Sequence, residues 1–383
     1  MQIAILAEDK AGFIKPMAEG LAKMLKNSDV EATIFYQGLA HADLAVSQSF
    51  ATGIKSRVKS IANLFSAVDH YITPKVTHQS YREFIASLKS FDAVVVVCPL
   101  PRAFTKGSLS AINDIRAKAQ IPVVLYQNYF LASRGPWFEK IVSAGGQGLE
   151  RFDWYLAATT LSEYPLGKLD DGRQWPVTSI GHDLRDESLA CQFKDKTKLP
   201  FKVLLDFPRQ GFESYRSTQK QVLDKMGLPY TELNGRYSIQ QIRKLYREHH
   251  AFMLSFRESF GLPIVENQLC GNWIFTPKKD WCPGHYLESS ESDELSKELM
   301  LGCNFVIYDN AHQLQQQLSR LMVLHQQDYD YQINFDHFTE QYPAFYHGNK
   351  QALEDFLARL KSGEINNQSH LGFSSLNKFI ANC

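Results

Sequence analysis

Several features that would assign a protein to a specialised class are missing from this sequence. The 383 residues include six cysteines but no Cys-x-x-Cys pair, so the spacing of a compact zinc site or a thiol redox motif is missing. Basic and acidic residues number 41 each, which excludes the strong positive charge typical of nucleic-acid-binding proteins. No apolar run approaches the ~18 to 20 residues that a membrane-spanning helix needs.

The N-terminal residues also lack the pattern of a secretory signal. The apolar run at 3–6 is short, no basic region precedes it, and Glu8 and Asp9 follow it. Together with the scattered cysteines, this predicts a cytoplasmic protein whose contact with a membrane is at most peripheral, at the inner surface. Residues 45–90 interleave basic and apolar side chains, and we interpret them either as a solvated helix on the first domain or as a surface for an anionic or lipid-linked acceptor.

The sequence does contain two successive series of alternating strand and helix patterns. The β-branched run at 91–98 is typical of a strand that is buried on both faces of a parallel sheet. The first series predicts strands at 3–7, 31–36, 91–98, 121–126, 154–158 and 177–180. The second series predicts strands at 201–205, 230–233, 251–254, 273–276 and 305–308, a helix at 217–226, and a helix to Tyr246 that Ser238 and Gln241 cap as a capping box.

A polar stretch between residues 183 and 200 separates the two series. Repeated βαβ units build doubly wound sheets, whose ligands bind outside the carboxyl ends of the strands. We therefore expect an α/β protein with two Rossmann-like domains, residues 1–190 and 191–361, that face each other across a cleft. The tail, residues 362–383, is expected to pack back on the first domain.

The most informative motif, residues 255–266, begins at the end of one of these predicted strands. Glu258 and Glu266 are eight residues apart around a Phe-Gly-Leu-Pro turn. A strand, a glycine turn and the start of a helix leave backbone N–H groups free to bind an anion. Two glutamates beside such a turn suit hydroxyl groups rather than phosphates. Sugar hydroxyls next to a phosphate describe a sugar nucleotide.

This segment resembles the Glu-any seven-Glu signature of GT-B glycosyltransferases, especially the large retaining family 4. The matching residues are Ser255, Glu258, Phe260, Gly261, Leu262, Pro263, Glu266, Cys270 and Gly271. Ser259 and Asn267 depart from the usual Gly and Ala. The resemblance covers 175–360 and is only architectural over 1–150. It implies a GT-B fold, with the donor on the second domain and the acceptor on the first.

The resemblance also implies roles for individual residues of the second domain. Glu266 would accept hydrogen bonds from the ribose hydroxyls of the donor, and Glu258 would lie near the transferred sugar. The backbone N–H groups that would face the sugar and the distal phosphate belong to Phe260, Gly261 and Leu262. The family places an Arg and a Lys after the first strand of this domain, where they contact the diphosphate.

Three cations follow the corresponding strand in this chain. Arg209 is our candidate for the first diphosphate contact. Arg216 and Lys220 are alternatives for the second, with Arg216 favoured by spacing. Two cations suit a departing diphosphate, because its charge grows as the glycosidic bond breaks. The loop that would hold the base contains Gly235, Arg236 and Tyr237.

The acceptor side departs from the family pattern. Only Gly12 remains of the usual glycine-rich turn after the first strand, so close approach of the backbone to the donor is not indicated there. Tyr126, Asn128 and Arg134 follow a first-domain strand and are our acceptor-facing candidates. These positions predict a cleft that both domains line.

The function that the resemblance implies is a retaining, metal-independent glycosyltransferase without a cofactor. It would move a sugar from a nucleotide-diphosphate sugar to a glycan or lipid-linked acceptor in bacterial surface polysaccharide synthesis, with no nucleic-acid partner. Two alternatives stay open. The missing glycine-rich turn motivates a catalytically silent sugar-nucleotide-binding partner protein of the same fold. A GT-B sugar-nucleotide epimerase is the other, although the sequence shows no separate acid/base set for it.

Overall fold

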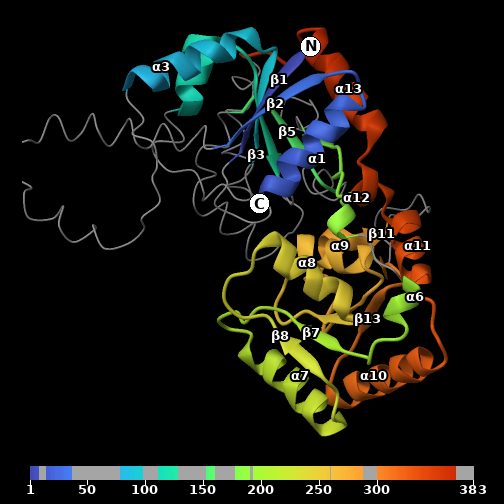
Figure 1. Ribbon diagram of the computed structural model, residues 1–383. Helices are drawn as coiled ribbons and strands as arrows, with labels where there is room; N and C mark the ends of the chain where they lie inside the picture. The colour runs from blue at the N-terminus through green and yellow to red at the C-terminus, as the bar shows by residue number, and fades with distance from the viewer. Residues whose placement is uncertain are drawn as a thin grey trace, which may run out of the picture.

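The computed structural model describes residues 1–7, 14–36, 78–97, 111–127, 152–159, 177–189, 193–258, 260–287 and 300–367. Within these residues the chain forms two large parallel sheets, which belong to the upper and lower lobes of Figure 1. Helices cover both faces of each sheet. This arrangement confirms the prediction of two doubly wound units.

The first sheet has the strand order β2-β1-β3-β4-β5-β6, and all neighbouring strands are parallel. Its strands are β1 (Gln2–Ala7), β2 (Glu31–Tyr36), β3 (Ala93–Val97), β4 (Val123–Gln127), β5 (Trp154–Ala157) and β6 (Val177–Ser179). Ile3 and Ile5 share a core with helix α1 (Ile14–Lys26), and Leu6 shares the opposite core with α3 (His78–Ser87) and η4 (Ile115–Ala119). Because both faces are covered, β3 is apolar throughout, and so is β1 after Gln2.

The second sheet has the strand order β13-β10-β9-β7-β8 and is also parallel. Its strands are β7 (Val203–Leu205), β8 (Tyr230–Glu232), β9 (Ala251–Met253), β10 (Trp273–Thr276) and β13 (Phe305–Ile307). Helices α8 (Ile239–Glu248) and α9 (Leu262–Leu269) share the core on one face. Helices α7 (Glu213–Met226) and α10 (Ala311–Gln326) share the core on the other.

Local signals explain where two of these helices begin. Ser238 accepts a hydrogen bond from the N–H of Gln241, whose side chain bonds back to the N–H of Ser238, so the predicted capping box of α8 is confirmed. Helix α7 begins at Glu213, earlier than the predicted residue 217. Its first turn is polar, and it therefore carries no apolar periodicity from which the start could be predicted.

The chain crosses between the two sheets twice, and the crossings lie against each other. The His182 N–H donates to the Ala344 carbonyl at 2.8 Å, and the Asn349 N–H donates to the Ile180 carbonyl at 2.8 Å. Gly181 has a φ of +67°, and a Cβ there would lie 2.1 Å from the Ala344 oxygen, so only glycine fits. The crossings are thus joined by backbone hydrogen bonds.

The remaining elements are mostly short, and the last of them returns the chain to the first sheet. They are η2 (Leu88–Ser90), η7 (Glu187–Leu189), α6 (Phe193–Lys196), η8 (Lys279–Trp281), η9 (Pro283–His285), β11 (Tyr286–Leu287), β12 (Met300–Leu301), α11 (Gln332–Gln341), α12 (Pro343–His347) and α13 (Lys350–Lys361). Helix α13 contacts α1 and β6, and the carbonyl of Asn367 accepts a hydrogen bond from Arg116. We therefore propose that the return to the first domain begins at α13, before residue 362. Residues 368–383 of the predicted tail lie outside the described residues.

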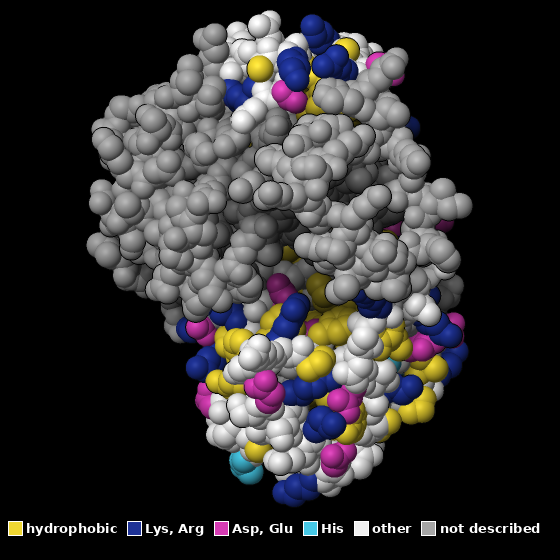
Figure 2. Space-filling view, turned by 90° about the vertical axis from the view of Figure 1, so that its left-hand side faces the viewer, with side chains coloured by type: hydrophobic (Ala, Val, Ile, Leu, Met, Phe, Trp, Pro, Cys, Tyr) yellow, Lys and Arg dark blue, Asp and Glu magenta, His cyan; other side chains and the backbone are white. Residues whose placement is uncertain are grey.

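The surface has two properties that bear on partners. Among the described residues, no helix is both long and apolar enough to cross a bilayer. Figure 2 shows Lys and Arg interspersed with Asp and Glu on the described part of the second domain, as the balanced composition predicts. The basic part of the predicted surface within residues 45–90 lies outside the described residues, which resume at residue 78.

Candidate functional site

The candidate site is built where two neighbouring strands of the second sheet end. Strands β7 and β9 are adjacent and parallel, so their carboxyl ends meet at the same edge. Asp206 follows β7, and its N–H donates to the carbonyl of Met253, the last residue of β9, at 3.0 Å. Ser255 and the predicted motif then continue from β9. This edge is where ligands of doubly wound sheets bind.

A glycine turn connects the end of β9 to helix α9. Gly261 has a φ of +61°, and a Cβ at this position would lie 2.4 Å from Cγ of Glu258. Its carbonyl accepts hydrogen bonds from the N–H groups of Ile264 and Val265, and Leu262 is the first helical residue. Both the backbone angle and the contact with Glu258 therefore require glycine. The predicted turn and helix start are present.

Phe260 anchors this turn in the interior. Its side chain is buried and stacks on the ring of His285 with 5.5 Å between the ring centroids. Its carbonyl is hydrogen-bonded to Nε2 of the same histidine. The buried ring of Phe260 thus holds the turn in place. Only the backbone of this residue is left to contact a ligand.

Glu258 and Arg209 come together at the sheet edge. Glu258 is half-buried, and Arg209 is exposed with its guanidinium 4.7 Å from the centroid of the Phe256 ring. Burial raises the pKa of Glu258 to about 7, against the opposing effect of the Arg209 charge. Arg209 is thereby an exposed cation that acts electrostatically on the first glutamate of the motif.

Asp206 is a candidate site residue that our reading of the sequence missed. It is buried at the carboxyl end of β7, and one of its oxygens accepts the N–H of Phe207 at 2.7 Å. Burial, and next the charge of Glu258, raise its pKa to about 8. Two acids with raised pKa values at one strand edge are typical of functional sites. The signal in the sequence was an acid directly after an apolar strand.

The two alternatives for the second cation share one acidic partner. The guanidinium of Arg216 lies 3.1 Å from Oε2 of Glu232, and Nζ of Lys220 lies 2.8 Å from Oε1 of the same carboxylate. Arg216 also donates to the carbonyl of Asp206 and to Oγ of Ser255. The side chain of Arg216 is only 10% exposed, whereas that of Lys220 is 39% exposed. Arg216 is therefore fixed in the sheet edge, and Lys220 reaches solvent.

The three predicted cations line one cavity of about 390 Å³ beside the first turns of α7. Its lining residues are Pro208, Arg209, Phe212, Glu213, Arg216, Ser217, Lys220, Gln221 and Asp224. Neither Glu258 nor Glu266 lines it. The structure thus groups the cations with one another and places Arg209 between this cavity and Glu258.

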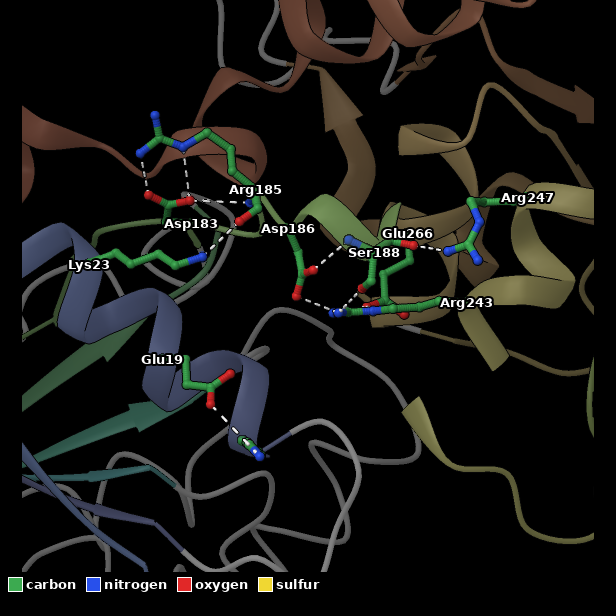
Figure 3. Close-up of polar contacts among 10 residues, drawn as sticks. Glu19, Lys23, Asp183, Arg185, Asp186, Ser188, Arg243, Arg247 and Glu266 are labelled. Atoms are coloured by element: carbon green, nitrogen blue, oxygen red, sulfur yellow. Dashed lines mark hydrogen bonds and ion pairs between the residues drawn. The ribbon is translucent and has the colours of Figure 1, made fainter. Parts of the chain in front are cut away.

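Glu266 lies in α9 and is buried against an arginine from α8. Its Oε1 accepts hydrogen bonds from Nε and Nη2 of Arg243 at 3.0 and 2.8 Å. Nη1 of Arg243 reaches Asp186, at 2.5 Å, in the segment between the two sheets (Figure 3). Burial raises the pKa of Glu266, and the charge of Arg243 opposes that rise. Sequence reasoning predicted the glutamate but not its partner, which is one of several arginines in a helical pattern.

The remaining predicted residues fall into three groups. Gly235, with a φ of +79°, and Arg236 form an exposed loop whose Tyr237 packs edge-to-face on Phe207. Tyr126 is fully buried, and its hydroxyl donates to the Gly181 carbonyl at 2.7 Å and contacts Nδ1 of His182. That environment gives Tyr126 a role at the junction of the domains rather than facing an acceptor. Residues outside the described part of the chain are Gly12, Asn128 and Arg134.

The described residues contain no group of three His, Cys, Asp or Glu side chains that could hold a metal ion. Cys282 is a buried thiol whose pKa responds to the charges of the two carboxyl groups. Burial, and next the charge of Glu258, raise its pKa well above the ordinary value. It therefore stays a neutral thiol, which is a poor nucleophile.

Comparisons with known proteins give structural likeness without sequence relatives. No protein-family model matches this chain, and no curated protein matches it. An alpha-glucosyltransferase in complex with UDP-glucose and DNA containing an abasic site is similar with a TM-score of 0.55 and 9% identity, over 94% of this chain and 99% of that one. The alpha-glucosyltransferase AGT in complex with UDP gives 0.51 and 10% over 94% and 100%. Anabaena Alr3699/HepE with UDP and glucose gives 0.47 and 14% over 94% and 100%.

At such low identity these likenesses show the fold alone. That fold is the two-domain GT-B arrangement, so the predicted fold class is confirmed. Membership of family 4 and the roles of individual residues stay predictions.

Proposed function

We propose that this chain is a glycosyltransferase that takes a sugar from a nucleotide-diphosphate sugar. The observation that carries the proposal is the placement of Glu258 and Glu266 on either side of the Gly261 turn, at the carboxyl edge of the second sheet. A turn at a helix start favours a phosphate, and carboxylates favour hydroxyl groups. A ligand that carries a phosphate next to sugar hydroxyls would engage both the helix start and the two carboxylates.

In this proposal the donor lies along the edge from α9 to α7. Oε1 of Glu266 is held by Arg243, and the second carboxylate oxygen would accept hydrogen bonds from the ribose hydroxyls. The backbone at Gly261 and Leu262 would face the distal phosphate and the sugar. Arg209 would contact the diphosphate, and the loop at 234–237 would hold the base.

The contacts of the other two cations support different proposed roles for them. Arg216 holds the Asp206 carbonyl and the Ser255 hydroxyl, so we assign it to fixing the strand edge. Lys220 bonds Glu232 and remains 39% exposed, so it can exchange that partner for a phosphate oxygen. Lys220 is therefore our candidate for the second diphosphate contact.

The carboxyl pair suits the approach of an anionic donor. Two charged acids at this edge would repel the diphosphate. With pKa values of about 7 for Glu258 and about 8 for Asp206, the pair holds at least one proton near neutral pH. The reduced negative charge leaves Arg209 as the dominant charge facing the leaving group.

The proposed reaction is a displacement with retention at the anomeric carbon. The bond from that carbon to the phosphate oxygen breaks, and the acceptor hydroxyl oxygen forms the new bond on the same face. The hydroxyl proton passes to the departing phosphate, whose charge Arg209 and Lys220 stabilise. We further propose that the acceptor is a glycan or a lipid-linked glycan of a bacterial surface polysaccharide, and that transfer takes place at the cytoplasmic face of the membrane.

The test is a panel of sugar nucleotides, beginning with UDP-glucose because solved proteins of this fold hold it. We expect one donor to raise the melting temperature and to release its nucleotide diphosphate slowly in the absence of acceptor. EDTA should leave both effects unchanged. If a folded sample responds to no donor, the proposed function is wrong.

A catalytically silent sugar-nucleotide binder is the second candidate. The observation in its favour is that Glu266, Arg216 and Lys220 all have partners within the chain. Product analysis separates the candidates. Transfer or hydrolysis supports the enzyme, binding alone supports the silent protein, and a new sugar nucleotide formed from the donor alone indicates an epimerase.

A further inference from the structure

One arginine joins the second motif glutamate to the segment between the two domains. The side chain of Arg243 is only 4% exposed and contacts three residues. Nε and Nη2 donate to Oε1 of Glu266 at 3.0 and 2.8 Å. Nη1 donates to Oδ2 of Asp186 at 2.5 Å and to Oγ of Ser188 at 2.8 Å. Figure 3 shows this guanidinium between Glu266 of α9 and the two residues of the interdomain segment, Asp186 and Ser188.

The geometry at Glu266 is asymmetric. Both donors of Arg243 converge on Oε1, and no hydrogen bond of Oε2 lies within the described part of the chain. A side-by-side pairing of guanidinium and carboxylate would have occupied both oxygens. Nη1 is instead turned to Asp186 and Ser188, and these contacts hold the guanidinium with its Nε–Nη2 edge on Oε1. One carboxylate oxygen is thus fixed by the protein while the other is kept for a ligand.

The segment that holds Nη1 is itself held from both domains. Nζ of Lys23, in α1 of the first domain, donates to the Arg185 carbonyl at 2.7 Å. Arg247, one turn after Arg243 in α8, donates to the Ser188 carbonyl. Ser188 in turn donates its N–H to Oδ1 of Asp186 at 2.8 Å. A shift of this segment would therefore be transmitted to Arg243 and through it to Glu266.

We propose that Arg243, anchored by Asp186 and Ser188, is a positioning residue that reserves Oε2 of Glu266 for the ribose hydroxyls of the nucleotide. The inference rests on the proposed function, because it assigns the partner of a glutamate in that same site. It adds that residues of the interdomain segment, which need not contact the nucleotide, set how well its ribose is bound.

The test compares ligands and variants together. UDP, GDP and ADP are titrated calorimetrically into the wild-type chain. The titration is then repeated with the 2′,3′-dideoxy form of the nucleotide that binds most tightly. The dideoxy form should bind the wild-type chain about tenfold more weakly, since hydrogen bonds to a charged group are lost. In Arg243→Gln the natural nucleotide should bind about tenfold more weakly, and the penalty for the dideoxy form should shrink to about twofold.

Three further variants keep the test decisive. Asp186→Asn removes the charge of a 37%-exposed side chain, so the chain is expected to fold, and the hold on Nη1 of Arg243 is weakened. It should show the same reduced ribose penalty, and it decides the matter if Arg243→Gln does not fold. Arg243→Lys should restore part of the penalty. Arg247→Gln is the matched control, because it contacts the same segment but not Glu266, and its penalty should equal that of the wild type.

The outcomes separate this inference from the proposed function. If the wild-type chain binds none of the nucleotides, the proposed function fails. If it binds one of them, but the ribose penalty is unchanged in folded Arg243→Gln and in Asp186→Asn, the inference is overturned while the function stands. A penalty that falls equally in Arg247→Gln also overturns it, since the effect would then come from the segment in general.

Discussion

The two glutamates of the motif, although they flank one turn, lie in opposite electrostatic surroundings. Glu266 is paired with a buried guanidinium 2.8 Å away. Glu258 has no ion pair among the described residues, and burial raises its pKa to about 7 against the opposing charge of Arg209. One end of the motif is therefore an ion pair with an internal cation, and the other is an acid whose pKa lies near neutral pH.

This difference matches the two tasks that we propose for the motif. An acceptor for ribose hydroxyls has to stay ionised and in place, which an internal cation ensures. A group beside a diphosphate and a reacting sugar is better left without a full charge until the ligand and Arg209 set its state. The spacing of two identical residues thus conceals two different environments.

The largest effect is expected from removing the cation of the charged end. Arg243→Ala leaves Glu266 buried without its partner, so the free energy of unfolding should fall by about 3 kcal/mol. Urea denaturation measures this loss. The double variant Arg243→Met/Glu266→Gln should recover most of it, because no uncompensated charge remains. A double variant as unstable as the single one would show that shape rather than charge holds this end.

A smaller effect is expected from Gly261→Ala, which acts on the Glu258 end. The added Cβ meets Cγ of Glu258 at 2.4 Å and the backbone is held at a φ of +61°, so the variant should lose roughly 2 kcal/mol of stability. Gly227→Ala is the control, because its φ is +62° and its Cβ would meet nothing within 4 Å. It should lose only about 1 kcal/mol.

The same variant sharpens the comparison functionally. Gly261→Ala displaces Glu258 but does not touch Arg243, so nucleotide affinity should change less than the rate of sugar release. Equal losses in both measurements would mean that the two ends of the motif do not act separately.

The smallest effect is expected in the pH dependence of stability. The unfolded chain releases the Asp206 proton near the ordinary value of 3.8, whereas the folded chain holds it to about pH 8. Between these values Asp206 binds more protons in the folded state, so its contribution to stability is greatest in acid and falls as the pH rises. From about pH 6 to about pH 7, Asp206→Asn should reduce this fall by about 1 kcal/mol. If Asp206→Asn leaves the change of unfolding free energy with pH unaltered in denaturant titrations, Asp206 does not hold this proton in the folded chain.

The sequence predicted those parts of the fold that depend on local pattern. The apolar runs, the capping box at Ser238 and the turn at Gly261 each follow from residues close together in the chain. The fully buried strands of the first sheet were readable because both faces need apolar side chains.

The parts that the sequence did not predict depend on contacts between distant residues. Asp206 becomes a site residue only because β7 lies beside β9, and Arg243 only because α8 packs against α9 and the interdomain segment. Tyr126 lies near the carboxyl end of β4, but its hydroxyl is used by Gly181 across the junction. Helix α13 lies within the range predicted for the second domain, yet it contacts the first.

The most direct test of the central claim is calorimetric titration of the donor found in the sugar-nucleotide panel into the wild-type chain and Glu266→Gln. The account predicts that the wild-type chain binds a single equivalent and that the variant, still folded, binds about tenfold or more weakly, a factor worth about 1.4 kcal/mol. Equal affinities in the two proteins would contradict it.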